Sequence, residues 1–100
     1  MQVQMNYANV EASEALETHI REALDATIGR FADRLTRIEV HLSDLNGPEK
    51  GGPNDKRCRI EVRPSGADPL LVESVADSFY GAADDAAGKL RRLLTSRLDR

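Results

Sequence analysis

Apolar and polar side chains alternate in three stretches of the chain, which is the pattern of a β-strand with one buried face. The first stretch is residues 2–7, and the same alternation recurs over residues 38–43 and 57–63. A fourth stretch, residues 70–75, follows a tight connection. The sequence therefore predicts four strands, and the last three follow one another closely enough to form a meander.

Apolar residues recur every three or four positions in two other stretches, as on the buried face of an amphipathic helix. The first stretch follows Ser13, a good helix cap, and its apolar positions are Leu16, Ile20, Leu24, Ile28, Phe31 and Leu35. Leu35 is either the end of this helix or already part of the connection to the next strand. The second stretch is capped by Asp77 or Ser78, and its stripe comprises Phe79, Ala83, Ala86 or Ala87, Leu90, Leu93 or Leu94, and Leu98.

The predicted order β-α-β-β-β-α gives an α+β fold in a single domain that spans residues 1–100. Because each helix must bury its apolar stripe, we expect both helices to pack side by side on one face of a four-stranded sheet. The other face stays open. The shared contacts of the helices should include Leu16, Ile20, Leu24, Ile28, Leu90 and Leu94. Residues 46–55 are rich in turn formers and are predicted to form a mobile loop.

The composition is that of a globular protein with a packed core, since 40% of the residues are apolar and 31% are charged. No apolar run approaches the roughly 20 residues that cross a membrane, and the N-terminus lacks a signal segment, so a cytoplasmic protein is expected. The single cysteine, Cys58, allows no internal disulfide and no multi-cysteine metal site. It is in phase with Ile60 and Val62, which predicts a thiol that points into the core.

No arrangement of residues predicts a catalytic centre. His19 and His41 are isolated, and each is expected on the surface or at the boundary of the core. Asp84 and Asp85 point about 100° apart on a helix, so they cannot easily share a metal ion. We therefore expect no enzyme activity, no cofactor, no metal and no small-molecule substrate.

The net charge of −3 hides local concentrations of cations. Residues 56–63 carry four basic side chains against one acidic, and residues 89–100 carry five against one. On the second helix, Lys89 and Arg92 share one face, and Arg91 lies on the next. This ridge is either a solvated helix end whose cations complement the helix dipole, or a surface for a polyanion such as RNA.

Patterns along the whole chain resemble one known family. In the last helix they are Phe79-Tyr80, Ala82, Asp84, Lys89-Leu90, Arg92 and Leu94. Earlier in the chain they are residues 1–5, Glu14-Ala15-Leu16 and the segment Arg30-Phe31-Ala32-Asp33-Arg34-Leu35. Together with the Lys-Arg-Cys-Arg-Ile-Glu-Val-Arg-Pro segment at residues 56–64, they are similar to the ribosome hibernation factors, formerly called sigma-54 modulation proteins.

This resemblance implies the same β-α-β-β-β-α fold and a ribosome-associated inhibitor of translation. Members bind 16S ribosomal RNA in the decoding region of the small ribosomal subunit, and so exclude messenger and transfer RNA. The RNA-binding residues that the resemblance implies are Lys89 and Arg92 first, then Arg30 and Arg34, with Arg91 and Arg97 in support. Since the chain stops at Arg100, it looks like the short form, without a C-terminal dimerisation domain. A second hibernation factor is a further candidate partner.

Two departures from the family pattern reduce the expected number of phosphate contacts. Ala8-Asn9 stands where members often carry a basic residue and a histidine, and residues 24–27 replace a lysine-rich segment. Binding is then weaker or more salt-sensitive than in other members, or it depends on Arg91, Arg97 and residues 56–63 in their place. The alternative function is that of a related RNA- or protein-binding domain in stress regulation that does not act on the ribosome.

Overall fold

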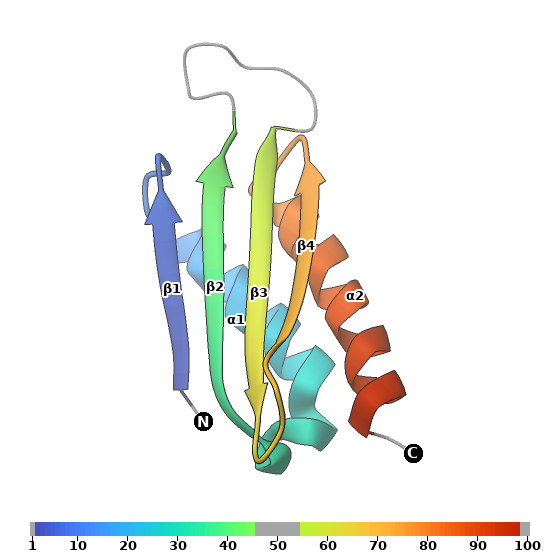
Figure 1. Cartoon of the computed structure of the whole chain (residues 1–100). Helices are drawn as coiled ribbons and strands as arrows, with labels where there is room; N and C mark the ends of the chain where they lie inside the picture. Colours follow the sequence, from blue (N-terminus) through green and yellow to red (C-terminus); the bar gives the residue numbers. More distant parts are fainter. Residues whose placement is uncertain (1, 46–54, 99–100) are drawn as a thin grey trace.

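The computed structural model of the chain describes residues 2–45 and 55–98. The elements in order are strand β1 (Gln2–Ala8), helix α1 (Glu14–Ile28), the 3-10 helix η1 (Gly29–Arg34), strands β2 (Leu35–Asp44), β3 (Lys56–Pro64) and β4 (Leu70–Ala76), and helix α2 (Phe79–Leu98). This order confirms the predicted β-α-β-β-β-α arrangement, with η1 as an addition between α1 and β2 (Figure 1).

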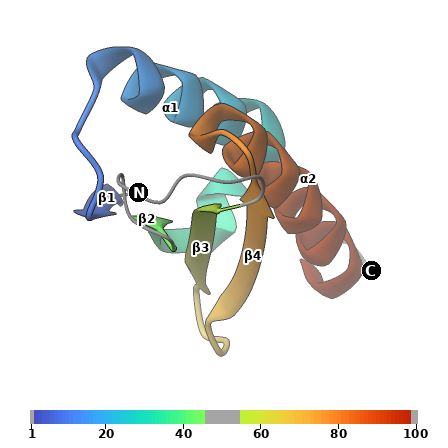
Figure 2. The same ribbon diagram turned by 90° about the horizontal axis from the view of Figure 1, so that it is seen from above.

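The strands form one mixed sheet in the order β1-β2-β3-β4. β1 runs parallel to β2, with α1 as the connection between them, whereas β2, β3 and β4 form the predicted antiparallel meander. β1 and β4 are therefore the two edges of the sheet. α1 and α2 lie side by side on the same face, and the other face of the sheet is uncovered (Figure 2).

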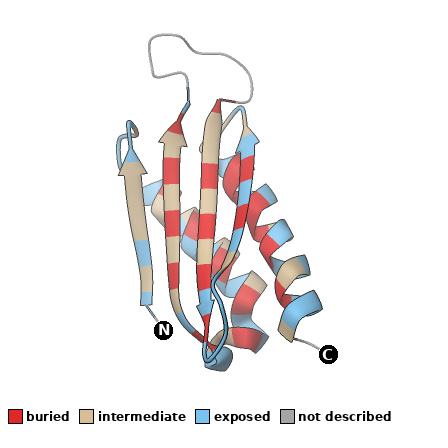
Figure 3. Cartoon of the chain, in the orientation of Figure 1, coloured by how far each residue is buried: buried red, intermediate tan, exposed pale blue. Residues whose placement is uncertain are grey.

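The core lies between the helix pair and the sheet. Buried and less buried positions alternate along β2 and β3, as the sequence pattern requires (Figure 3). The six residues expected at the helix contacts, Leu16, Ile20, Leu24, Ile28, Leu90 and Leu94, are each no more than 4% exposed. Cys58 is fully buried as predicted, and this burial raises the pKa of its thiol to about 12.

The first helix ends earlier than its apolar period predicts. α1 stops at Ile28, residues 29–34 wind as the 3-10 helix η1, and Leu35 already begins β2. Glycine is a weak helix former, so Gly29 is a natural place for the change in winding. The tighter helix still keeps Phe31 in the core. The alternative in which Leu35 belongs to the connection is therefore nearer to the structure.

Serine side chains cap both helices. The Ser13 hydroxyl accepts a hydrogen bond from the amide of Leu16, and the Ser78 hydroxyl accepts one from the amide of Gly81. Of the two candidates for the second cap, Ser78 rather than Asp77 makes this bond. The loop predicted to be mobile lies, except for the buried Asp55, outside the described residues. Within the described part of the chain, no helix is long and apolar enough to cross a membrane.

Candidate nucleic-acid interface

Lys89 and Arg92 lie on the side of α2 that faces the edge of the sheet. The ammonium of Lys89 donates a hydrogen bond of 2.8 Å to the main-chain carbonyl of Glu73 in β4. Both cations line a cavity of about 310 Å³ between α2 and β4, together with Ser74 and Asp85. The spacing of three residues thus puts them on one face, as predicted, and that face adjoins β4.

Arg30 and Arg34 lie on the opposite side of α2, where η1 approaches its last turns. Arg30 donates a hydrogen bond of 3.4 Å to the Thr95 hydroxyl, and its guanidinium carbon lies 4.8 Å from the centre of the Phe31 ring. Arg34 Nη1 donates a hydrogen bond of 2.6 Å to the carbonyl oxygen of Leu98. A cation at the carbonyl end of a helix is favoured by the helix dipole, so Arg34 also fastens η1 to α2.

Three arginines of α2 are free to take a partner. Among the described residues, Arg91, Arg92 and Arg97 make no hydrogen bond and no ion pair, and all three are exposed. Arg97 borders a second cavity, of about 600 Å³, between the end of α2 and the β3–β4 turn. Unpaired exposed guanidinium groups are the side chains that phosphate contacts require.

Four of the six predicted residues form two groups on either side of α2. Lys89 and Arg92 adjoin β4, whereas Arg30 and Arg34 belong to η1 and contact the last turns of α2. Arg91 and Arg97 lie on the same half of α2. That both groups act as one RNA-binding surface stays a prediction. The sequence did not reveal that Arg30 and Arg34 contact the end of α2, because the apolar period ran through η1 without a break.

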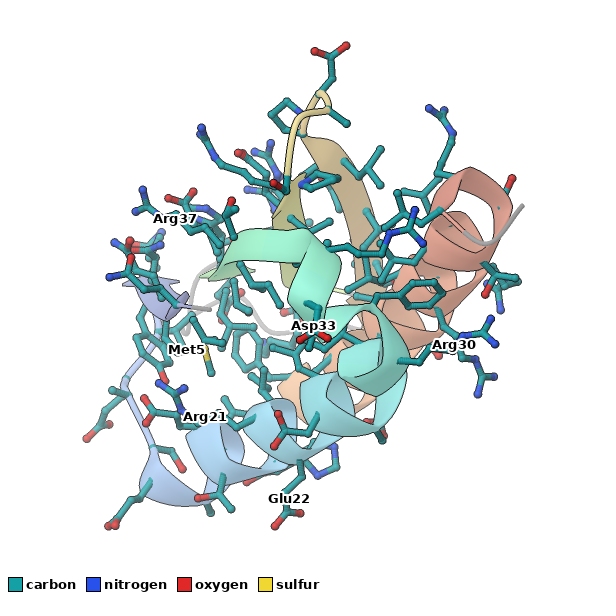
Figure 4. All side chains as sticks on the ribbon, turned by 90° about the horizontal axis from the view of Figure 1, so that it is seen from below. Met5, Arg21, Glu22, Arg30, Asp33 and Arg37 are labelled. Carbon is teal, nitrogen blue, oxygen red and sulfur yellow. The ribbon has the colours of Figure 1, made fainter. Side chains whose placement is uncertain are left out.

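The exposed side of α1 has the opposite charge. Glu14, Glu17, Glu22 and Asp25 are exposed or half-buried there, against the single cation Arg21, which pairs with Glu17 at 3.4 Å (Figure 4). The N-terminal part of α2 adds Asp84 and Asp85. Carboxylates repel phosphates, so the helix layer is suited to a polyanion only along the C-terminal half of α2 and at η1.

The uncovered face of the sheet carries charges of both signs in contact with each other. Three arginines pair there with glutamates, namely Arg37 with Glu39 at 2.7 Å, Arg63 with Glu61 at 3.4 Å and Arg59 with Glu73 at 3.7 Å. Arg57 donates instead to the Ser43 hydroxyl at 3.0 Å. His41, half-buried as the sequence suggests, lies 3.6 Å from Glu39.

Two polar contacts hold the other end of the domain together. His19 Nε2 lies 2.8 Å from Asp84 Oδ1, and its ring meets that of Tyr80 edge-on, so this histidine links α1 to α2. Asp55 raises the pKa of the Lys56 ammonium, which lies 2.9 Å from that carboxylate, and Asp44 adds to the effect. The described residues contain no cluster of three or more His, Cys, Asp or Glu that could hold a metal ion.

The family model described as sigma 54 modulation protein / S30EA ribosomal protein matches residues 3–100. The chain belongs to this family. One relative of this chain is the chloroplastic ribosome-binding factor PSRP1 of spinach, Spinacia oleracea, which is 22% identical over 92 residues. That stretch is 92% of the present chain but only 30% of the spinach protein, so the chain spans less than a third of this relative.

Two solved structures share the fold of this S30EA family member. A ribosomal subunit interface protein from Coxiella burnetii superposes with a TM-score of 0.81 at 19% identity, and all of both chains is covered. The N-terminal domain of Protein Y from Thermus thermophilus gives a TM-score of 0.76 at 23% identity, with 96% of this chain and 98% of that chain covered. At these identities the likeness concerns the fold alone.

Proposed function

We propose that this S30EA family domain binds the small ribosomal subunit through 16S ribosomal RNA in the decoding region, and so excludes messenger and transfer RNA. It acts as a hibernation factor, by occupancy and without catalysis, in the cytoplasm. A second hibernation factor is a candidate partner. The observation that carries the proposal is the C-terminal half of α2, where Arg91, Arg92 and Arg97 are exposed and have no partner among the described residues.

A surface with exposed, unpaired arginines can bind phosphates. Folded RNA is recognised mainly by its shape and its phosphates, which needs positioned cations and no base-reading motif. Arg30 and Arg34 add two cations beside the same helix half, 3.4 Å from Thr95 and 2.6 Å from the Leu98 carbonyl. The names of the relatives agree with this proposal, since one is a ribosome-binding factor and another a ribosomal subunit interface protein.

Co-sedimentation with purified 30S subunits at several salt concentrations tests the proposal. Each phosphate contact contributes a slope of about −0.7 to −0.9 to the log-log dependence of affinity on salt. The double variant Lys89→Gln with Arg92→Gln should therefore bind more weakly, flatten the slope by about 1.4 to 1.8, and relieve inhibition of translation in vitro.

Arg21→Gln is the matched control, because Arg21 is an exposed arginine within the acidic side of α1. It should bind like the parent. If the parent does not sediment with 30S subunits but retains isolated RNA, the regulatory RNA-binding alternative takes the place of the ribosomal one. Equal binding of the parent and the double variant at every salt concentration would contradict the docking residues.

A further inference from the structure

We propose that the RNA-binding surface continues around the η1 end of the domain onto the uncovered sheet face, where Arg37 and Arg63 contact RNA phosphates. This inference rests on the proposed function and extends it to two residues outside the helices. The surface is called the basic end below, and its cations are Arg30, Arg34, Arg37, Arg63 and Arg97. The partner is a phosphate backbone that bends around this end.

Short contacts connect the helix side of the basic end to its sheet side. Arg34 reaches α2 with its guanidinium, at the Leu98 carbonyl, while its own main-chain carbonyl accepts a hydrogen bond of 2.8 Å from the amide of Ser65. Ser65 follows the last residue of β3. In the same corner, the hydroxyl of Thr36 donates a hydrogen bond of 3.0 Å to the carbonyl of Arg63. Hydrogen bonds therefore join the helix side of the basic end to its sheet side.

Basic and acidic side chains gather at opposite ends of the molecule. A polyanion is therefore attracted to the basic end. Among the described residues, the basic end holds five arginines; Asp33 and Asp68 are exposed there, and Glu39 and Glu61 pair with Arg37 and Arg63 on its sheet side. Seen from this end, Arg30 lies beside α2, Arg37 lies toward β1, and Asp33 lies between them (Figure 4). At the opposite end, where both helices begin, most of the charged side chains described are acidic, and they include Glu11, Glu14, Glu17, Asp44, Asp55, Asp77, Asp84 and Asp85.

The register of β2 and β3 puts Arg37 and Arg63 directly opposite each other. Like charges in that position destabilise a strand pair, so the arrangement is unfavourable unless an anion lies nearby. In the next row, Glu39 and Glu61 also face each other and pair with the two arginines at 2.7 and 3.4 Å. One phosphate placed between the guanidinium groups would add a shared anion to the glutamate that each arginine already has.

Arg37 and Arg63 can bind a phosphate without leaving their glutamates. Their side chains are 39% and 51% exposed, whereas those of Glu39 and Glu61 are only 18% and 26% exposed. A guanidinium has five N–H donors, so its exposed edge can bind a phosphate while another donor stays with the glutamate. The Nη2 of Arg37 also donates a hydrogen bond to the side-chain carbonyl of Gln4 on β1.

Arg57 and Arg59 supply the matched control on the same sheet face. They lie in the rows farther from η1, where Arg59 pairs with Glu73, and the sheet ends beside Asp44 and Asp55. Replacing both with glutamine removes two positive charges, which is the same number as in the variant of Arg37 and Arg63. A loss caused by net charge alone would therefore be equal in the two double variants.

The experiment measures binding to 30S subunits at 0.1 M salt and across a salt series for three variants. Arg37→Gln with Arg63→Gln should weaken binding about 25- to 60-fold at 0.1 M salt and flatten the salt slope by about 1.4 to 1.8, as the loss of two phosphate contacts requires. Arg57→Gln with Arg59→Gln should stay within about threefold of the parent, because exposed charges beyond a Debye length are screened. Asp33→Asn should bind more tightly than the parent.

The pair Arg37→Lys with Arg63→Lys keeps both charges and should retain most of the affinity, which separates a phosphate contact from damage to the fold. Equal weakening in the two arginine-to-glutamine variants would overturn the inference while leaving the proposed function intact. Failure of the parent itself to bind 30S subunits would overturn the proposed function instead.

Discussion

The ammonium of Lys89 donates a hydrogen bond to the main-chain carbonyl of Glu73, 2.8 Å away, and so ties α2 to the outer edge of the sheet. β4 is an edge strand, and unpaired carbonyls on such a strand can recruit further strands. A lysine beside an edge strand is one of the features that disfavour such pairing. Lys89, which the resemblance implies as a leading phosphate contact, thus also has a hydrogen-bond partner within the domain.

Lys89 and Arg92 should therefore differ in their effect on stability. Lys89→Gln should lower the free energy of unfolding by about 0.5 to 1 kcal/mol, because it loses a hydrogen bond to a charged donor at a partly exposed site. Arg92→Gln should leave stability within about 0.5 kcal/mol of the parent, as expected for a surface residue without partners. Urea unfolding of the two single variants measures the difference. Equal stabilities would mean that the Lys89 contact contributes nothing.

Ser74 offers a stabilising substitution. Its side chain is 5% exposed, and its hydroxyl oxygen has no hydrogen-bond partner among the described residues. Removing a buried hydroxyl that lacks a partner should raise the free energy of unfolding, so Ser74→Ala is expected to gain about 1 kcal/mol. Ser43→Ala is the comparison, because the Ser43 hydroxyl accepts a hydrogen bond from Arg57. Thermal unfolding should rank Ser74→Ala above the parent and Ser43→Ala at or below it.

The sequence predicted the fold well because its strands and helices have clear periods. Ile38, Val40 and Leu42 alternate strictly, and a strand with one buried face is the structure that this spacing allows. The end of α1 was misplaced because Phe31 and Leu35 continue the helical spacing although residues 29–34 wind as a 3-10 helix. A 3-10 turn that follows an α-helix keeps its apolar residues near the same face, so periodicity does not distinguish the two.

The candidate site was less predictable than the fold. Helical spacing correctly placed Lys89 and Arg92 on one face, since that is a property of a single helix. The approach of Arg34 to Leu98 and the position of Arg37 opposite Arg63 depend on how η1 meets α2 and on strand register. Contacts between residues so far apart in sequence leave no local pattern to read. The pairing of His19 with Asp84 was missed for the same reason.

Leu90 should be a sensitive position of α2 for stability. It is fully buried between the helix pair and the sheet, whereas Leu93, one turn further on, is only half-buried. Leu90→Ala should therefore lower the free energy of unfolding by about 2 to 5 kcal/mol, as cavity-forming changes in a core do. Leu93→Ala should cost less than half as much. Denaturant titrations of both variants give the two values, and similar losses would contradict this view of the core.

Cys58 should make stability depend on pH in alkaline solution. Burial raises the pKa of its thiol from 9.0 to about 12, so between these values the folded state keeps a proton that the unfolded chain releases. Stability is then unaffected below pH 9 and falls as the pH rises above it, by at most about 1.4 kcal/mol per pH unit. Unfolding of the parent and of Cys58→Ala across this range measures the effect. The variant should have a shallower decline, and parallel curves would contradict the assignment.

The separation of charge along the domain gives it a large dipole in spite of its small net charge of −3. The field of a polyanion exerts a torque on such a molecule. Before any contact forms, this torque turns one end toward the polyanion, namely the end with Arg30, Arg34, Arg37, Arg63 and Arg97. The same field repels the ends of the helices that carry glutamate and aspartate. Orientation during diffusion then raises the fraction of encounters that lead to docking, and added salt slows association by shortening the range of that field.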